Sequence, residues 1–217
     1  MTTELKIDFV SDVSCPWCAI GLASLERALE RLEGEVRADL HFQPFELNPG
    51  MPAGGQDVTE HLTQKYGSTP QQQAQSRDAI RARGAAVGFD FRKEGRGRVY
   101  NTFDAHRLLH WAGAEYPESQ RALKKELLKA YFTHGRSPED REVLLQAAAQ
   151  AGLDPQGARD VLDGGRYAAQ VREREQFYLD HGIHAVPAVI VNDRHLIQGG
   201  QPPEVFEDAL RRIAASA

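Results

Sequence analysis

The chain contains little cysteine and no long apolar run. Its 217 residues include only two cysteines, Cys15 and Cys18. A bridge between residues three positions apart closes too short a loop to add much stability, which excludes a structural disulfide framework. No stretch reaches the roughly 18 apolar residues that a membrane-spanning helix requires. The two cysteines are therefore expected to perform local chemistry, and no membrane association is expected.

Basic blocks and a secretion signal are also missing from the sequence. The 26 Lys and Arg residues are outnumbered by 31 Asp and Glu residues and are spread along the chain, for a formal net charge of -5. Nucleic acid is therefore not an expected partner. The first ten residues have neither a basic start with an apolar run nor a small-residue cleavage site, so the sequence predicts a cytoplasmic protein.

A zinc site built on the two cysteines would lack two further ligands. The chain has no third cysteine, and no finger-like spacing links the pair to His41, His61, His106 or His110. Since 41% of the residues are hydrophobic, the chain can bury a core without metal or disulfide bridges. We expect no metal and no tightly bound cofactor.

Hydrophobic patterning predicts an α/β fold. Residues 5–10 form a strand pattern, and a helix begins at Pro16 and ends near Gly34. A second strand is predicted at 38–45. Turn-forming residues then lead into a helical stretch with predicted helices at 58–66, 70–86, 101–112, 117–134, 138–151 and 155–162. The chain closes with a helix at 166–181, strands at 188–191 and 195–198 around a tight turn, and a helix at 203–214.

Two helix starts in the helical stretch carry capping signals. Thr69 with Gln72, and Ser137 with Asp140, have capping-box spacing, and a proline follows the first residue of each pair. The predicted order is therefore β-α-β, a block of helices, and then α-β-β-α.

The two cysteines lie where a helix N-terminus can activate a thiol. The pattern places Cys15 at the N-cap and Cys18 in the first turn. Unpaired N–H groups and the helix dipole stabilise a thiolate at the N-cap. With two residues between them, Cys18 can attack a mixed disulfide formed on Cys15 and resolve it.

A second signal is Val186-Pro187, directly before an apolar strand. Proline cannot donate to a sheet ladder, so this position is either an ordinary strand start or a cis peptide turn. In a thioredoxin-like fold a cis-proline here packs beside the reactive sulfur. It leaves the backbone of the preceding residue free to pair with an extended substrate.

Four stretches resemble the DsbA family, in its FrnE-like branch. They are residues 11–21 around Cys15-Pro16-Trp17-Cys18, residues 45–49, residues 101–107 and residues 186–188. The resemblance covers essentially the whole chain and implies a thioredoxin-like fold with an inserted all-helical domain. It implies a discontinuous thioredoxin-like domain at 1–49 and 165–217 and a helical domain at 50–164. It makes Cys15 the attacking thiol, Cys18 the resolving thiol and Pro187 the cis-proline.

The resemblance also indicates residues that bind substrate. Pro16, Trp17 and Val186 flank the thiols, and the helix containing residues 101–107 faces the active site in the family, so Asn48, His106 and Arg107 are candidates to line a cleft. His106 and His110 are four residues apart and could present two imidazoles on one helix face, but no third ligand can be named, so packing or solvent exposure is the favoured interpretation of the pair. The backbone of Gly199-Gly200-Gln201-Pro202 could hold a carboxylate such as that at the glutamyl end of glutathione, or form an ordinary strand-to-helix turn.

Two aspartates are candidates for the buried carboxylate that takes a proton from the resolving cysteine in thioredoxins. Asp8 lies near the end of the first strand, one residue further from the cysteines than in thioredoxin, so an exposed position on the strand is the alternative. Asp12, in the loop before Cys15, is a similar candidate for this proton-accepting role. The sequence does not choose between them.

The leading hypothesis is a disulfide reductase or isomerase acting on protein or small thiols, with glutathione a candidate cosubstrate. DsbA oxidases have histidine in place of Trp17; indole lacks its charge, which predicts a less oxidising disulfide. The alternative is a glutathione-dependent isomerase or transferase of the kappa-class or 2-hydroxychromene-2-carboxylate type. Those relatives generally have serine in place of Cys15, which argues against an isomerase or transferase function for this chain. A third possibility is a non-catalytic module that holds extended peptides.

Overall fold

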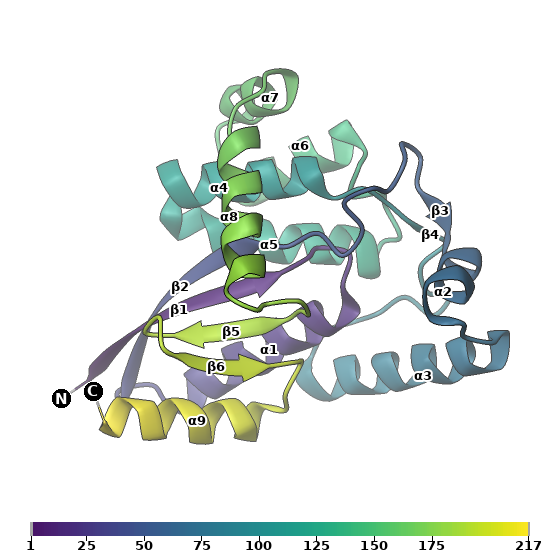
Figure 1. Cartoon of the computed structure of the whole chain (residues 1–217). Helices are drawn as coiled ribbons and strands as arrows, with labels where there is room; N and C mark the ends of the chain where they lie inside the picture. The colour runs from purple at the N-terminus through teal and green to yellow at the C-terminus, as the bar shows by residue number, and fades with distance from the viewer. Residues whose placement is uncertain (1, 217) are drawn as a thin grey trace.

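A four-stranded mixed sheet is formed by the N-terminal and C-terminal parts of the chain (Figure 1). The structure is a computed structural model and describes residues 2–216. The strand order is β2-β1-β5-β6, with β1 parallel to β2 and antiparallel to β5, and β6 antiparallel to β5. The strands are β1 (Thr3–Ser11), β2 (Val36–Pro44), β5 (Ala188–Val191) and β6 (His195–Gln198).

Helices cover both faces of this sheet. Leu5, Ile7 and Phe9 of β1 point to one face, where they share a core with α1 (Pro16–Arg31) and α9 (Pro203–Ala215). Val10 points to the other face and packs against Tyr178 of α8 (Ala168–Asp180). Because side chains alternate along a strand, Asp8 lies on the α8 face with Val10.

The remaining helices all lie between residues 50 and 164, here called the helical segment. They are α2 (Val58–Tyr66), α3 (Pro70–Val87), α4 (Phe103–Glu115), α5 (Pro117–Phe132), α6 (Arg141–Gln150) and α7 (Pro155–Asp163). Trp111, Leu123 and Leu144 belong to a core of this segment, whereas Leu128 and Tyr131 of α5 pack into the core that contains both cysteines. The predicted fold class is confirmed, and the division into two domains stays a prediction.

The structure adds two short strands to the predicted elements and moves the start of one helix beyond its predicted cap. Two-residue strands β3 (Gln56–Asp57) and β4 (Arg98–Val99) pair within the helical segment, and strands so short leave no periodic pattern. Helix α6 begins later than predicted, because Asp140 and not Ser137 is its N-cap, accepting from the amides of Glu142 and Val143. The capping box of Thr69 and Gln72 is present as predicted.

None of the helices in the part of the chain that the structure describes has the length and hydropathy needed to cross a bilayer.

Candidate active site

Cys15 is the N-cap of α1 and Pro16 occupies the first turn, as the sequence predicts. The amide of Cys18 donates to the Cys15 carbonyl at 3.1 Å, which holds the two residues in one tight turn. Both thiols are free. Cys18 is completely buried, whereas Cys15 retains 4% exposure and lines a surface groove. Only the first thiol can therefore meet a substrate directly.

The two thiols have pKa values shifted in opposite directions. A hydrogen bond from the Cys18 side chain lowers the pKa of Cys15, and the backbone amides of Cys18 and Trp17 lower it further. Burial and the nearby Asp12 carboxylate oppose this shift. Burial raises the pKa of Cys18 well above its ordinary value, and a negative charge on Cys15 raises it more. The arrangement favours a thiolate on Cys15 and a thiol on Cys18.

The backbone before Pro187 lies beside the Cys15 sulfur. The Val186-Pro187 bond is cis, and Cys15 Sγ is 3.7 Å from the Val186 carbonyl oxygen. Helix α1 comes close to this loop at Gly21, where an added Cβ would lie 3.0 Å from Pro187 Cγ. The Gly199 amide donates to the Pro187 carbonyl at 2.8 Å. Gly200 packs against the Trp17 backbone, so Gly199-Gly200 acts here as a close-packed turn.

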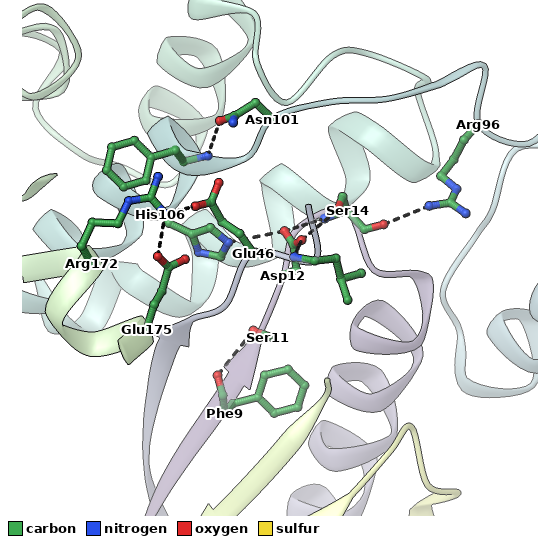
Figure 2. A network of polar contacts seen from close by, with 12 residues as sticks. Phe9, Ser11, Asp12, Ser14, Glu46, Arg96, Asn101, His106, Arg172 and Glu175 are labelled. Carbon is green, nitrogen blue, oxygen red and sulfur yellow. Dashed lines mark hydrogen bonds and ion pairs between the residues drawn. The ribbon is translucent and has the colours of Figure 1, made fainter. Parts of the chain in front are cut away.

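A buried network surrounds Asp12, directly before the cysteine turn (Figure 2). Its carboxylate accepts from the amides of Leu47 at 2.8 Å and Ser14 at 3.1 Å and from the Ser14 hydroxyl at 2.9 Å. His106 Nε2 lies 3.4 Å from Oδ1, and both side chains are 1% exposed. Burial alone would raise the pKa of Asp12, but His106 and the two amides lower it to about 2. Asp12 is therefore an anion at neutral pH.

The network corrects the prediction that His106 and Arg107 line a substrate cleft. His106 is fully enclosed because its ring points inward to Asp12 (Figure 2). Arg107 is buried as well, since its guanidinium donates to the carbonyls of Val161, Gly164 and Arg166. Neither residue lines the groove beside Cys15.

His106 and His110 do not converge on one site, which agrees with the packing alternative of the sequence analysis. The His110 ring lies against Tyr167, with ring centroids 5.3 Å apart, while His106 faces Asp12. Among residues 2–216 no group of three or more His, Cys, Asp or Glu side chains is placed to hold a metal ion.

Of the two aspartates, Asp8 lies on the wrong side of the sheet to exchange a proton with Cys18. It is 4% exposed, so the alternative of an exposed strand position is also wrong. Its carboxylate accepts from Gln43 at 2.6 Å and pairs with Lys6 at 3.2 Å. Cys18 belongs to the core on the α1 face. Asp12 is near the cysteines, but its low pKa leaves it unable to hold a proton at neutral pH.

A groove of about 730 Å³ opens beside Cys15. Four of the predicted substrate-binding residues, Pro16, Trp17, Val186 and Asn48, line it. The helical segment contributes two cations that the sequence analysis missed: Lys65, which donates to Asn48 Oδ1 at 2.7 Å, and Arg96, which donates to the Ser14 carbonyl at 3.1 Å. Arg96 lies in a loop without a pattern, so no sequence signal pointed to it.

A second polar cluster holds the end of β2 to α8. Arg172 of α8 pairs with Glu46 and, at 2.8 Å, with Glu175, and its guanidinium lies 3.9 Å from the Phe103 ring centroid (Figure 2). Glu46 belongs to the motif at residues 45–49. Its side chain points to α8, so this part of the motif acts in packing.

Lys124 of α5 is a further residue that the sequence analysis missed. It is 0% exposed, and its Nζ has no hydrogen-bond partner among residues 2–216. Helical spacing could have found it, because Gln120, Lys124, Leu128 and Tyr131 recur along the buried face of α5.

Comparison with known proteins shows a matching family and several similar structures. The family model of the DSBA-like thioredoxin domain matches residues 6–211. The Bacillus subtilis protein YwbO is 26% identical over 97% of this chain and 96% of its own length. The crystal structure of a probable DsbA oxidoreductase from Streptomyces coelicolor is 34% identical, with a TM-score of 0.87, covering 98% of this chain and 90% of that chain.

A third similarity is to the cytosolic disulfide reductase DsbM from Pseudomonas aeruginosa, solved with GSH. It has a TM-score of 0.65 at 19% identity and covers 97% of this chain and 99% of that chain, which shows a shared fold. Taken with the family match over nearly the whole chain and the paired thiols at the start of α1, these similarities lead to one conclusion. The chain belongs to the DSBA-like thioredoxin domain family of thiol–disulfide oxidoreductases.

Proposed function

We propose that the protein is a disulfide reductase or isomerase that works through a mixed disulfide on Cys15. The observation that carries this proposal is the contrast between the two thiols. Cys15 has a lowered pKa and borders the groove, and Cys18 is a buried thiol with a raised pKa in the same turn. A nucleophile needs the first set of properties, and a resolving group that waits until the mixed disulfide forms needs the second.

The reaction proceeds in two exchanges. The Cys15 thiolate attacks one sulfur of a substrate disulfide, forms a Cys15–substrate bond and releases the other sulfur as a thiolate that takes up a proton. Cys18 then loses its proton and attacks Cys15 Sγ, and the second substrate sulfur leaves and is protonated. The substrate disulfide is reduced to two thiols, and the protein dithiol is oxidised to a Cys15–Cys18 disulfide.

The substrate lies along the loop before Pro187. The Val186 carbonyl, 3.7 Å from the Cys15 sulfur, is available to pair with an extended backbone or with a peptide-like small thiol. Lys65 and Arg96 give the groove a positive character. We therefore propose that its small-molecule substrates include glutathione or its mixed disulfides, whose carboxylates suit these cations.

The proposed compartment is the cytoplasm, and the proposed branch of the family is the FrnE-like one. In a reducing compartment the resting protein is the dithiol. Trp17 provides no positive charge to stabilise the Cys15 thiolate. We expect a reduction potential between about -120 mV, as in DsbA, and about -270 mV, as in thioredoxin.

Two cysteine variants test this function. With glutathione disulfide or insulin as the substrate, Cys18→Ser should accumulate mixed disulfides between Cys15 and glutathione or an insulin chain, seen by mass spectrometry, whereas Cys15→Ser should lose exchange completely. The Cys15–Cys18 potential is measured by equilibration in glutathione buffers. Full insulin reduction by Cys15→Ser would show that the nucleophile is wrong. A potential as high as that of DsbA would replace the reductant assignment with an oxidase.

A second candidate function is a glutathione-dependent isomerase or transferase, favoured by the cations in the groove. In that reaction Cys15 would activate glutathione and Cys18 would be dispensable. The Cys18→Ser variant separates the two functions: turnover of a glutathione-dependent reaction at an undiminished rate would favour the isomerase or transferase.

A further inference from the structure

The resolving step leaves one problem in proton transfer. Cys18 must ionise before it attacks, yet burial and the neighbouring Cys15 raise its pKa well above the ordinary value. Neither aspartate can help: Asp8 is on the opposite face of the sheet, and Asp12 has a pKa of about 2. A proton acceptor on the Cys18 side must come from elsewhere in the fold.

Lys124 is the group in the correct place. Helix α5 contributes Leu128 and Tyr131 to the core that contains both cysteines, and Lys124 lies one helical turn before Leu128 on the same face. Its side chain is completely buried, and Nζ forms no hydrogen bond with any atom of residues 2–216. A buried amine without a partner is costly for a fold, so such a group calls for a functional explanation.

Three acidic groups act on this amine, namely Cys18, Asp12 and Cys15. Glu26 of α1 also reaches α5, where it pairs with Arg121 and Lys125. Cys15 and Cys18 lie at the start of α1, and Asp12, paired with His106 of α4, lies at the end of β1. The buried residues of α6 are apolar, and the charged side chains of β2 lie at exposed positions. Burial lowers the pKa of Lys124, while negative charge on Cys18, Asp12 and Cys15 raises it. The same charge interaction lowers the pKa of Cys18.

We propose that Lys124 is the proton acceptor of Cys18 in the resolving step. This inference rests on the proposed function, since it concerns the second exchange of that reaction. In the mixed disulfide, the neutral Lys124 amine takes the Cys18 proton and becomes an ammonium ion beside the new thiolate. Cys18 Sγ attacks Cys15 Sγ, the bond between Cys15 and the substrate breaks, and the leaving thiolate takes a proton from solvent. The ammonium returns its proton to solvent once Cys18 is neutral in the disulfide.

The proposal explains why the amine has no partner in the dithiol state. A hydrogen bond or ion pair with Asp12 would keep the amine protonated and unable to accept. Asp12 is instead occupied by Ser14, Leu47 and His106, which leaves the lone pair of Lys124 free for the cysteine.

The test uses the reduced protein and the disulfide reagent DTNB in a stopped-flow experiment. Attack by Cys15 releases a first coloured thiolate, and resolution by Cys18 releases a second, so the two exchanges are seen separately. In Lys124→Met, which keeps the length and loses the amine, the second phase should slow about 100-fold, within the range of a positioned proton acceptor. The first phase should stay within about twofold of the unmodified protein.

The pH profile distinguishes proton acceptance from packing. Without the acceptor only the spontaneously ionised fraction of Cys18 reacts, so the second phase of Lys124→Met should rise tenfold per pH unit, whereas the unmodified chain should depend on pH only weakly. Lys129→Met is the matched control, because Lys129 lies on the same helix, is half exposed and, within residues 2–216, pairs only with Glu126, at 2.8 Å. Both of its phases should be unchanged.

Two kinetic outcomes would overturn the proposal: an unchanged second phase in Lys124→Met, or an equal loss in both phases. Absence of the first phase in the unmodified protein would instead reject the proposed function. If Lys124→Met does not fold, lysine side-chain NMR of the reduced native protein provides the answer. One lysine should titrate below the ordinary range near about 10.4, because burial lowers the pKa of Lys124. If all lysines remain charged up to that range, Lys124 is not the acceptor.

Discussion

The regions that flank the groove contribute different kinds of chemistry to it. The sheet, α1 and the loops that join them provide the thiols, Pro187, the Val186 carbonyl and the Asp12 carboxylate beside the cysteine turn. The cations Lys65 and Arg96, the buried amine of Lys124 and the imidazole that faces Asp12 all come from the helical segment. The difference teaches that the motif and its neighbours determine the nucleophile and its pKa, while the helical segment contributes the cations along the groove and the partner of Asp12.

The contact between Asp12 and His106 connects the loop before α1 to the helical segment. Its removal should therefore cause the largest loss of stability among the changes considered. Asp12→Ala leaves the amides of Leu47 and Ser14 and the ring of His106 buried without their acceptor. The free energy of unfolding should fall by about 3 to 5 kcal/mol, as for other broken buried pairs. Urea unfolding at neutral pH measures the loss.

The matched control is Asp39→Ala, which removes an exposed partner of His41. It should cost less than about 1 kcal/mol. Equal losses in the two variants would show that the buried pair is no more important than a surface one.

Acidification should weaken the same contact by a smaller amount. The folded-state pKa of Asp12 is about 2, below its ordinary value of 3.8, so its contribution is fully present above about pH 4. The contribution is lost as the pH falls from 4 to 2, and it amounts to roughly 2 kcal/mol. Asp12→Asn should lack this dependence. A difference in unfolding free energy between the two proteins that stays constant from pH 5 to 2 would contradict the assignment.

A positive charge introduced on α1 should change the reduction potential, because the cations along the groove would then no longer come from the helical segment alone. In Trp17→His an imidazolium near the helix start would stabilise the Cys15 thiolate and hence the reduced form. The reduction potential should rise by about 30 mV, a tenfold change in the equilibrium with glutathione. Trp17→Phe, which adds no charge, should shift it much less. A larger shift in Trp17→Phe would mean that packing, and not charge, controls the potential at this position.

Removal of one groove cation of the helical segment should have the smallest effect, a change in KM for a charged disulfide. Lys65→Met should raise KM for glutathione disulfide about fivefold, because one partly exposed charge contact contributes up to about 1 kcal/mol. It should leave the rate with the uncharged 2-hydroxyethyl disulfide unchanged. Lys93→Met, an exposed lysine outside the groove, is the control. Equal effects on both disulfides would show that Lys65 does not recognise charge.

The sequence predicted the parts of the site that depend on local structure. A cysteine pair before a helix that begins with proline, and a proline before an apolar strand, determine the backbone positions of Cys15, Cys18 and Pro187. The short distance between Cys15 and Val186 was expected from the family resemblance.

The electrostatic part of the site could not be predicted in this way. Helical spacing shows which side of α4 carries His106, but it does not show which partner that side meets, and the resemblance suggested the groove instead of Asp12. Asp8 and Asp12 are close in sequence, yet strand alternation and the end of β1 send them to different surroundings. Lys124 was missed because its neighbour Lys125 is partly exposed and two consecutive lysines suggest a solvated surface.

The close approach of α1 to the loop before β5 has a consequence for the choice of substrate. A methyl group at position 21 would already meet the Pro187 ring, and Phe9 and Gly200 close off the other directions. The spacing between α1, whose N-cap is Cys15, and the loop that contains Val186 and Pro187 is therefore determined by the packing of Gly21 against the Pro187 ring. A bound chain must adapt its own shape to this gap. If the protein acts on disulfides as proposed, we expect those in flexible or unfolded segments to react faster than those inside tightly folded domains, because a flexible chain adapts to this gap more easily.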